Sequence, residues 1–367
     1  MPADDLPSRS PSSLPPRFES LDRRLLNAVL WLVIVVTTVV VLREGKDIFV
    51  PMVIAAVAVY LVNVLSRLVR GFSIAGRRLP MPICMIMSFV VIFGLGYLLF
   101  KIVAENALLV AEAAPEYQRR LIQLQRDFFT KIGINEPLEF REMIRSIDLQ
   151  ALFGTVASTL AGIFGMVSLV LLYSLFMLIE LRFLSNKFEA LVPDSKRRAT
   201  LAMMMSRIDH DIRTYLGVKT VVSLITALIS YIIMLMVGLK FAEFWALLVF
   251  ILNFIPTIGS IVSTLLPTIF AAVHFTTLGP FLVVAIGITA VQQLMGNVLE
   301  PNLMGQTLNI SPLVVFSSLI IWGSIWGVVG MFLCVPITVI IAMALANFEN
   351  TRWVSVLLSK TGRVRDG

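Results

Sequence analysis

Long apolar runs, most of them near the length of one membrane crossing, dominate this chain. A helix needs about 20 mostly apolar residues to cross the hydrocarbon core of a bilayer. The runs lie at 25–42, 48–65, 82–104, 152–179, 215–237, 244–256, 281–298 and 312–346. Hydrophobic residues make up 58% of the 367 residues, which is more than one soluble core could bury. The sequence therefore predicts an all-α, polytopic transmembrane protein with about eight membrane segments and the lipid bilayer as its surroundings.

The polar segments between these runs predict how the chain is organised. In order, we expect a disordered cytoplasmic tail (1–24), three transmembrane helices (25–104), an extracytoplasmic amphipathic insertion (105–151), a fourth transmembrane helix (152–181), a cytoplasmic amphipathic linker helix (182–214), a transport core with broken helices (215–346) and a cytoplasmic tail (347–367). Lys and Arg are frequent in the segments that this order leaves in the cytoplasm, and the short outer loops have almost none. The positive-inside rule therefore predicts that both termini are cytoplasmic.

Two of the polar segments have amphipathic helical patterns. In the outer insertion, Leu121 and Phe128 belong to one apolar stripe, and Phe140 and Ile147 belong to a second stripe after a break. These two helices could pack on each other, lie on the membrane surface or contact a neighbouring subunit. In the linker, Asp194 stands just before a periodic run, where a helix-capping residue is expected.

The last third of the chain interrupts its apolar runs with helix-breaking residues. The segment from Asn253 to Ser260 places an amide, Pro256 and Gly259 at membrane depth, and Pro267 follows. Lipid offers no partner to the backbone groups that a break frees, so these groups must meet protein or water. In secondary transporters, broken helices near the midplane supply polar contacts for a solute or an ion. A proline kink in an ordinary helix bundle is the simpler alternative.

The run after this break ends in a short polar stripe. Gln293, Asn297 and Glu300 are spaced by four and three residues, so an α-helix would place them on one face. Such residues at membrane depth are expected to face a cavity or protein partners and are candidates for function. If Glu300 is buried, it could carry a proton; if it lies at the interface before a loop, it stays ionised. The sequence leaves both readings open.

Proline and glycine recur through the rest of this region. We predict further helix breaks or hinges at Pro301, Gly305, Pro312, Gly327, Gly330 and Pro336. Glycine permits hinge-like backbone conformations, but it also permits close helix packing, and the two readings have equal weight here.

Several classes of function lack their sequence signatures. The chain has no phosphate-binding loop of the G-x-x-x-x-G-K-[ST] type, no H-E-x-x-H zinc helix and no G-x-S-x-G nucleophile elbow, so we expect neither an enzyme nor a cofactor. His210 and His274 have no companions at ligand spacing, which argues against a metal site. The formal net charge of +7 lies in short loops beside apolar runs, which fits membrane orientation better than nucleic-acid binding.

The motifs of the last third resemble those of one bacterial family. The matching residues are Ile255-Pro256 with Gly259 and Pro267, Asn297 with Glu300-Pro301 and Gly305, Pro312, Trp326-Gly327 with Gly330, and Val335-Pro336. With these residues the chain resembles the autoinducer-2 exporter family over residues 25–348. The segment 215–220 is most similar to the branch associated with that signalling molecule. Many relatives have a glycine-glutamine pair where Gly217-Val218 stands, which limits what can be transferred from them.

The resemblance implies a homo-oligomer, a pentamer, in the bacterial cytoplasmic (inner) membrane, with a separate path in each subunit. It implies export of a small polar solute such as autoinducer-2, with Asn253, Ser260, Gln293, Asn297 and Glu300 on the path. Some relatives exchange Na⁺ or Li⁺ for H⁺, so an antiporter that uses Glu300 as its titrating group is the alternative within transport. A membrane scaffold that transports nothing is the alternative of another class.

Overall fold

The computed structural model describes residues 16–71, 79–132, 151, 154–155, 158–159, 162, 165–304, 309–346 and 351–362. Every regular element in these ranges is a helix, and one isolated bridge joins Ile310 to Ser359. Within the described residues, five helices are long and apolar enough to cross a membrane, and three apolar helices are shorter. The predicted all-α, polytopic fold is thereby confirmed. The second predicted helix of the outer insertion and Gly305 lie outside the described residues.

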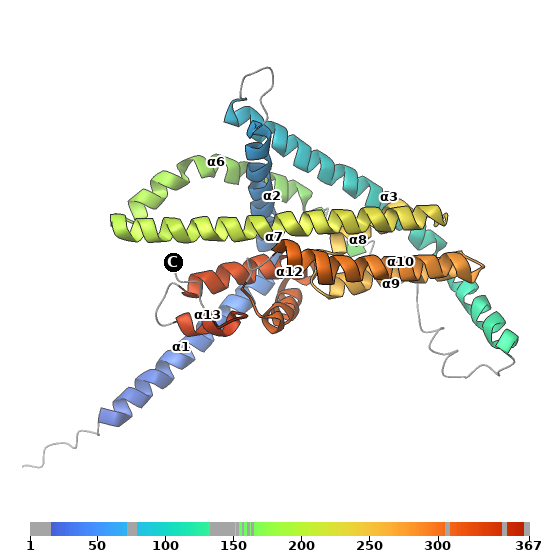
Figure 1. The fold of residues 1–367 in the computed structure, drawn as a ribbon. Coiled ribbons are helices and arrows are strands. Elements are labelled where there is room, and N and C mark those ends of the chain that lie inside the picture. Colours follow the sequence, from blue (N-terminus) through green and yellow to red (C-terminus); the bar gives the residue numbers. More distant parts are fainter. Residues whose placement is uncertain are drawn as a thin grey trace, which may run out of the picture. The chain divides into compact units, whose positions relative to one another are not determined.

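The chain divides into two compact units, Met1–Phe49 and Val50–Gly367. The first unit contains α1 (Pro16–Glu44) and the beginning of α2 (Lys46–Gly71). The second unit continues with α3 (Met81–Ile132), α6 (Val167–Leu191), α7 (Ser195–Met236), α8 (Ala242–Leu252), α9 (Ile258–His274), α10 (Leu278–Leu294), the π-helix η1 (Met295–Leu299), α11 (Glu300–Met304), α12 (Pro312–Ala346) and α13 (Arg352–Leu358) (Figure 1).

The two longest helices each join segments that the sequence analysis treated separately. Helix α3 continues without a break from the third predicted span into the outer insertion. Helix α7 joins the predicted linker to the span that follows it. The Asp194 side chain accepts a hydrogen bond from the backbone N–H of Lys196 at 3.0 Å, so the predicted helix cap is confirmed. No proline interrupts α7, which explains why it runs on as one helix.

Most of the core of the second unit lies where α8 and α10 pack against α7 and against α9. The side chains of Trp245, Phe270, Met234 and Ile288 are fully buried there. The rings of Trp245 and Phe270 lie 5.1 Å apart between their centroids. Figure 1 shows α7, α9 and α10 with nearly parallel axes, and α10 contacts both α7 and α9. Large aromatic side chains therefore hold α8 against α9 within this group of helices.

Two interruptions bend the chain within this unit, and glycine is essential at both. A Cβ atom on Gly259 would lie 1.8 Å from the carbonyl oxygen of Leu252, and one on Gly330 would lie 1.9 Å from that of Trp322. Within α12, Gly327 has φ 61° and ψ −140°, a conformation that essentially only glycine adopts. Close approach of two backbone segments therefore requires glycine at Gly259 and Gly330, and the positive φ requires it at Gly327.

The prolines differ from the glycines in their effect. Helix α9 continues past Pro267 and α12 continues past Pro336, so the breaks predicted at these two prolines are absent. Each proline removes one backbone donor from a helix that packing within the protein keeps intact. Pro312 is the first residue of α12, where its missing N–H costs nothing. Pro301 follows Glu300 in the short helix α11.

Candidate transport site

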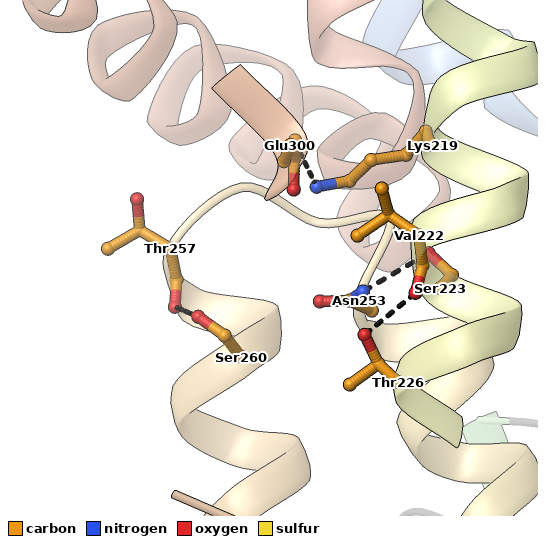
Figure 2. A network of polar contacts seen from close by, with 8 residues as sticks. All are labelled: Lys219, Val222, Ser223, Thr226, Asn253, Thr257, Ser260 and Glu300. Atoms are coloured by element: carbon orange, nitrogen blue, oxygen red, sulfur yellow. Dashed lines mark hydrogen bonds and ion pairs between the residues drawn. The ribbon is translucent and has the colours of Figure 1, made fainter. Parts of the chain in front are cut away.

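The break between α8 and α9 covers five residues, 253–257. Local turns satisfy several of its backbone groups: the N–H of Ile255 bonds to the carbonyl of Leu252 at 2.9 Å, and that of Gly259 bonds to Ile255 at 3.1 Å. Thr257 has φ 61° and ψ −61°, a strained conformation for a β-branched residue. Its carbonyl accepts a hydrogen bond from the Ser260 hydroxyl at 2.9 Å, so the half-buried Ser260 caps the break (Figure 2).

Asn253 connects this break to α7. Its side chain is buried, and its Nδ2 donates a hydrogen bond to the Ser223 hydroxyl at 3.2 Å (Figure 2). The remaining acceptor of the Asn253 amide and the lone pairs of Ser223 can still take part in further hydrogen bonds. The predicted site residue Asn253 is therefore a buried polar contact between the broken segment and a long membrane helix.

Glu300 forms a buried ion pair with a residue that the sequence analysis did not select. The Lys219 ammonium nitrogen lies 2.6 Å from the Glu300 Oε1, and the two side chains are 7% and 19% exposed (Figure 2). Lys219 belongs to α7 and Glu300 begins α11, so the pair joins elements 81 residues apart. Breaking such a pair leaves a buried charge without compensation, which is costly. Glu300 therefore has a basic partner on a distant helix of the same chain.

A polar stripe along α7 unites these contacts, and we call it the α7 polar stripe. It consists of Tyr215, Lys219, Ser223, Thr226 and Ser230, all buried and spaced by four, four, three and four residues. This spacing places them on one helix face over roughly 22 Å. The Thr226 hydroxyl bonds to the Val222 carbonyl at 2.7 Å (Figure 2), while the hydroxyls of Tyr215 and Ser230 have no hydrogen-bond partner among the described residues.

The predicted stripe of Gln293, Asn297 and Glu300 is divided in the structure. The side chains of Gln293 and Asn297 are exposed on this chain and hydrogen-bond to each other, whereas Glu300 turns toward α7. The π-helix η1, which contains Asn297, separates Gln293 from Glu300, and the N–H of Glu300 bonds to the carbonyl of Met295, five residues earlier. A π-turn holds one residue more than an α-turn, so it changes the direction of every side chain after it.

A second buried amide lies beside the one that the spacing favoured. Gln292 is buried on α10, and its Nε2 donates a hydrogen bond to the hydroxyl of the fully buried Ser263 on α9 at 2.8 Å. Its neighbour Gln293 is the predicted site residue, because its spacing with Asn297 and Glu300 is that of one α-helical face. The packing of α9 against α10 buries Gln292 and leaves Gln293 exposed.

Metal-binding chemistry is not visible in the described part of the chain. No group of three or more His, Cys, Asp or Glu side chains in these residues could hold a metal ion. Cys84 and Cys334 are buried free thiols. The ring of His274 stacks on Phe270 with an interplanar angle of 8°. Lys219, Glu300 and the hydroxyl and amide groups around them are therefore the chemical groups of the candidate site.

In comparison with known proteins, residues 30–350 match the AI-2E transporter family. The AI-2 transport protein TqsA of Escherichia coli (strain K12) is 31% identical over 343 residues, which cover 91% of this chain and 96% of TqsA. YhhT of the same strain is 28% identical over 344 residues, covering 92% and 95%. A Haemophilus influenzae protein is 32% identical over 289 residues, covering 77% and 83%. The names of the last two mention transport and no solute.

Proposed function

Because the chain belongs to the AI-2E family of transporters, we propose that it is a secondary carrier that exports a small polar solute. The observation that carries this proposal is the α7 polar stripe, which faces the broken segment at Asn253 and the carboxylate of Glu300. Buried polar side chains in a membrane helix are expensive, so they mark a solute or ion pathway by default. A broken helix beside them supplies further backbone groups for a solute.

The chemistry of the stripe favours a neutral solute with several hydroxyl groups. Lys219 and Glu300 neutralise each other's charge, and the neighbouring groups are hydroxyls and an amide. Hydroxyl and amide groups act as both donors and acceptors, which suits a polyhydroxylated molecule. An autoinducer-2-like solute is our proposal, because TqsA is named as an AI-2 transport protein. Outward direction and a gradient as the energy source belong to the same proposal.

We place the carrier in the bacterial cytoplasmic membrane with both termini in the cytoplasm, as a homo-oligomer and specifically a pentamer. The exposed polar pair Gln293 and Asn297 supports contact with a neighbouring subunit, because exposed amides in a membrane segment need a polar partner. Exchange of Na⁺ or Li⁺ for H⁺ is the alternative within transport, and a membrane scaffold without transport is the alternative of another class.

Efflux of autoinducer-2 from proteoliposomes tests the proposal with two matched variants. Thr226→Val removes a buried hydroxyl from the α7 polar stripe, and Thr220→Val removes an exposed hydroxyl from the same helix. Both hydroxyls bond to a backbone carbonyl four residues earlier, so their local cost is matched. We expect Thr226→Val to lower the efflux rate about tenfold, the value of one hydrogen bond, and Thr220→Val to leave it unchanged.

Two results would count against the carrier. Efflux no faster than from protein-free vesicles, for autoinducer-2 and for a panel of small polyols, would favour the scaffold. Equal rates for the two threonine variants would remove the α7 polar stripe from the pathway.

A further inference from the structure

A carboxylate inside a membrane protein needs a neutralising partner. The partner can be a proton, a bound cation or a basic side chain, because an ion without compensation is too costly to bury. If a carrier neutralises its own carboxylate with a proton or a cation from solution, transport by that carrier is coupled to that ion. The identity of the neutralising group at Glu300 therefore decides which ion, if any, the carrier needs.

In this chain the neutralising group is part of the protein. The Lys219 ammonium approaches the Glu300 carboxylate to 2.6 Å, and both side chains are largely removed from solvent. Tyr215 on α7 is close enough to interact with Glu300, and Cys334 on α12 is close to Tyr215; both are buried and carry groups that are ordinarily neutral at pH 7. No acidic cluster in the described residues would offer a small cation a better place. The ion pair therefore fills the position that a free cation would take.

We propose that Lys219 is a built-in counter-ion that replaces a coupling cation at Glu300. The site is then electrically neutral without Na⁺ or a titrating proton, and the carrier completes its cycle with the solute alone. This statement about the transport cycle rests on the proposed function. The affinity of the Lys219–Glu300 pair for Na⁺ or H⁺ can be tested without it. Removing the ammonium should expose a carboxylate with an affinity for Na⁺ or H⁺ that the natural chain lacks.

Thermal unfolding of the full-length chain in detergent tests the binding chemistry without any solute. The comparison uses NaCl against choline chloride at equal ionic strength, and pH 6 against pH 8. For Lys219→Met we expect the melting temperature to rise by roughly 3–5 °C in Na⁺ at 100 times its Kd, or on acidification. The natural chain, the double variant Lys219→Met/Glu300→Gln and the exposed-lysine control Lys240→Met should show no ion-specific rise.

A charge-reversed variant keeps the test valid if Lys219→Met does not fold. Lys219→Glu/Glu300→Lys restores an ion pair of opposite orientation and should again show no ion-specific rise. A Na⁺-specific or acid-induced rise in the natural chain would overturn the inference. A folded Lys219→Met chain without any gain in response to Na⁺ or acid would overturn it as well.

Transport supplies the second arm of the experiment. In proteoliposomes, efflux of autoinducer-2 by the natural chain should be the same in Na⁺ and choline buffers, and efflux by Lys219→Met should fall at least tenfold when Na⁺ is absent at pH 8. If no vesicle transports autoinducer-2, the proposed solute fails while the unfolding data still decide the role of Lys219. If Na⁺ stimulates the natural chain, the counter-ion inference fails while the carrier function stands.

Discussion

Helices α3 and α7 have similarly apolar membrane-length segments, yet they use their polar residues differently. The segment Met81–Leu99 of α3 exposes apolar side chains such as Ile86 and Val90 and buries few polar ones. Helix α7 also exposes apolar side chains, including Leu224 and Leu228, but it buries Asp211 and the five residues of the α7 polar stripe. Apolar surface does not draw helices together in lipid, because the lipid is equally apolar. The comparison teaches that polar contacts determine which face of α7 lies inside the protein.

The largest effect is expected at Gly259, which follows the break between α8 and α9. Gly259→Ala would place a Cβ atom 1.8 Å from the Leu252 carbonyl oxygen and should destabilise the chain by about 4 kcal/mol. Gly94→Ala in α3 has open space around the added atom and should be neutral or slightly stabilising. Thermal unfolding in detergent measures both. Equal melting temperatures for the two variants would show that the break tolerates a side chain.

The next effect separates a buried ion pair from an exposed one. Lys219→Met leaves the Glu300 carboxylate buried without a partner and should cost about 3 kcal/mol of stability in choline buffer at pH 8. Lys101→Met removes the exposed partner of Glu105 in α3, a pair at 3.8 Å, and should change stability by less than about 0.5 kcal/mol. Denaturant unfolding of both variants provides the measurement. A loss of equal size in α3 would mean that burial does not set the strength of the pair.

The smallest effect concerns two hydrogen bonds between side chains. In a double-mutant cycle, Asn253→Leu and Ser223→Ala should show a coupling of about 1 kcal/mol, because each is the buried partner of the other. The exposed pair Gln293 and Asn297 should show less than about 0.5 kcal/mol in the isolated subunit when both are changed to Leu. A stronger coupling for the exposed pair would indicate that an assembled oligomer buries it.

Much of the candidate site could be read from the sequence, and the rest required specific contacts. Asn253 and Glu300 were predicted because polar residues at membrane depth stand out against an apolar run. The α7 polar stripe could have been found in the same way, since its spacing of four, four, three and four residues is visible in the sequence. Lys219 was missed because its partner lies 81 residues away. The division of Gln293 and Asn297 from Glu300 was missed because the prediction assumed α-helical turns where η1 has a π-turn.

Sequence alone determined that this protein belongs in lipid, that it is helical and that glycine stands at its main interruptions. These properties are local: hydropathy decides between water and lipid, and close backbone contact or an unusual φ demands glycine at Gly259, Gly327 and Gly330. Only the tertiary structure decided which polar groups meet. The pairs formed by Lys219 with Glu300 and by Asn253 with Ser223 depend on how α7 packs against segments distant in the chain, and no periodicity along one helix encodes that packing.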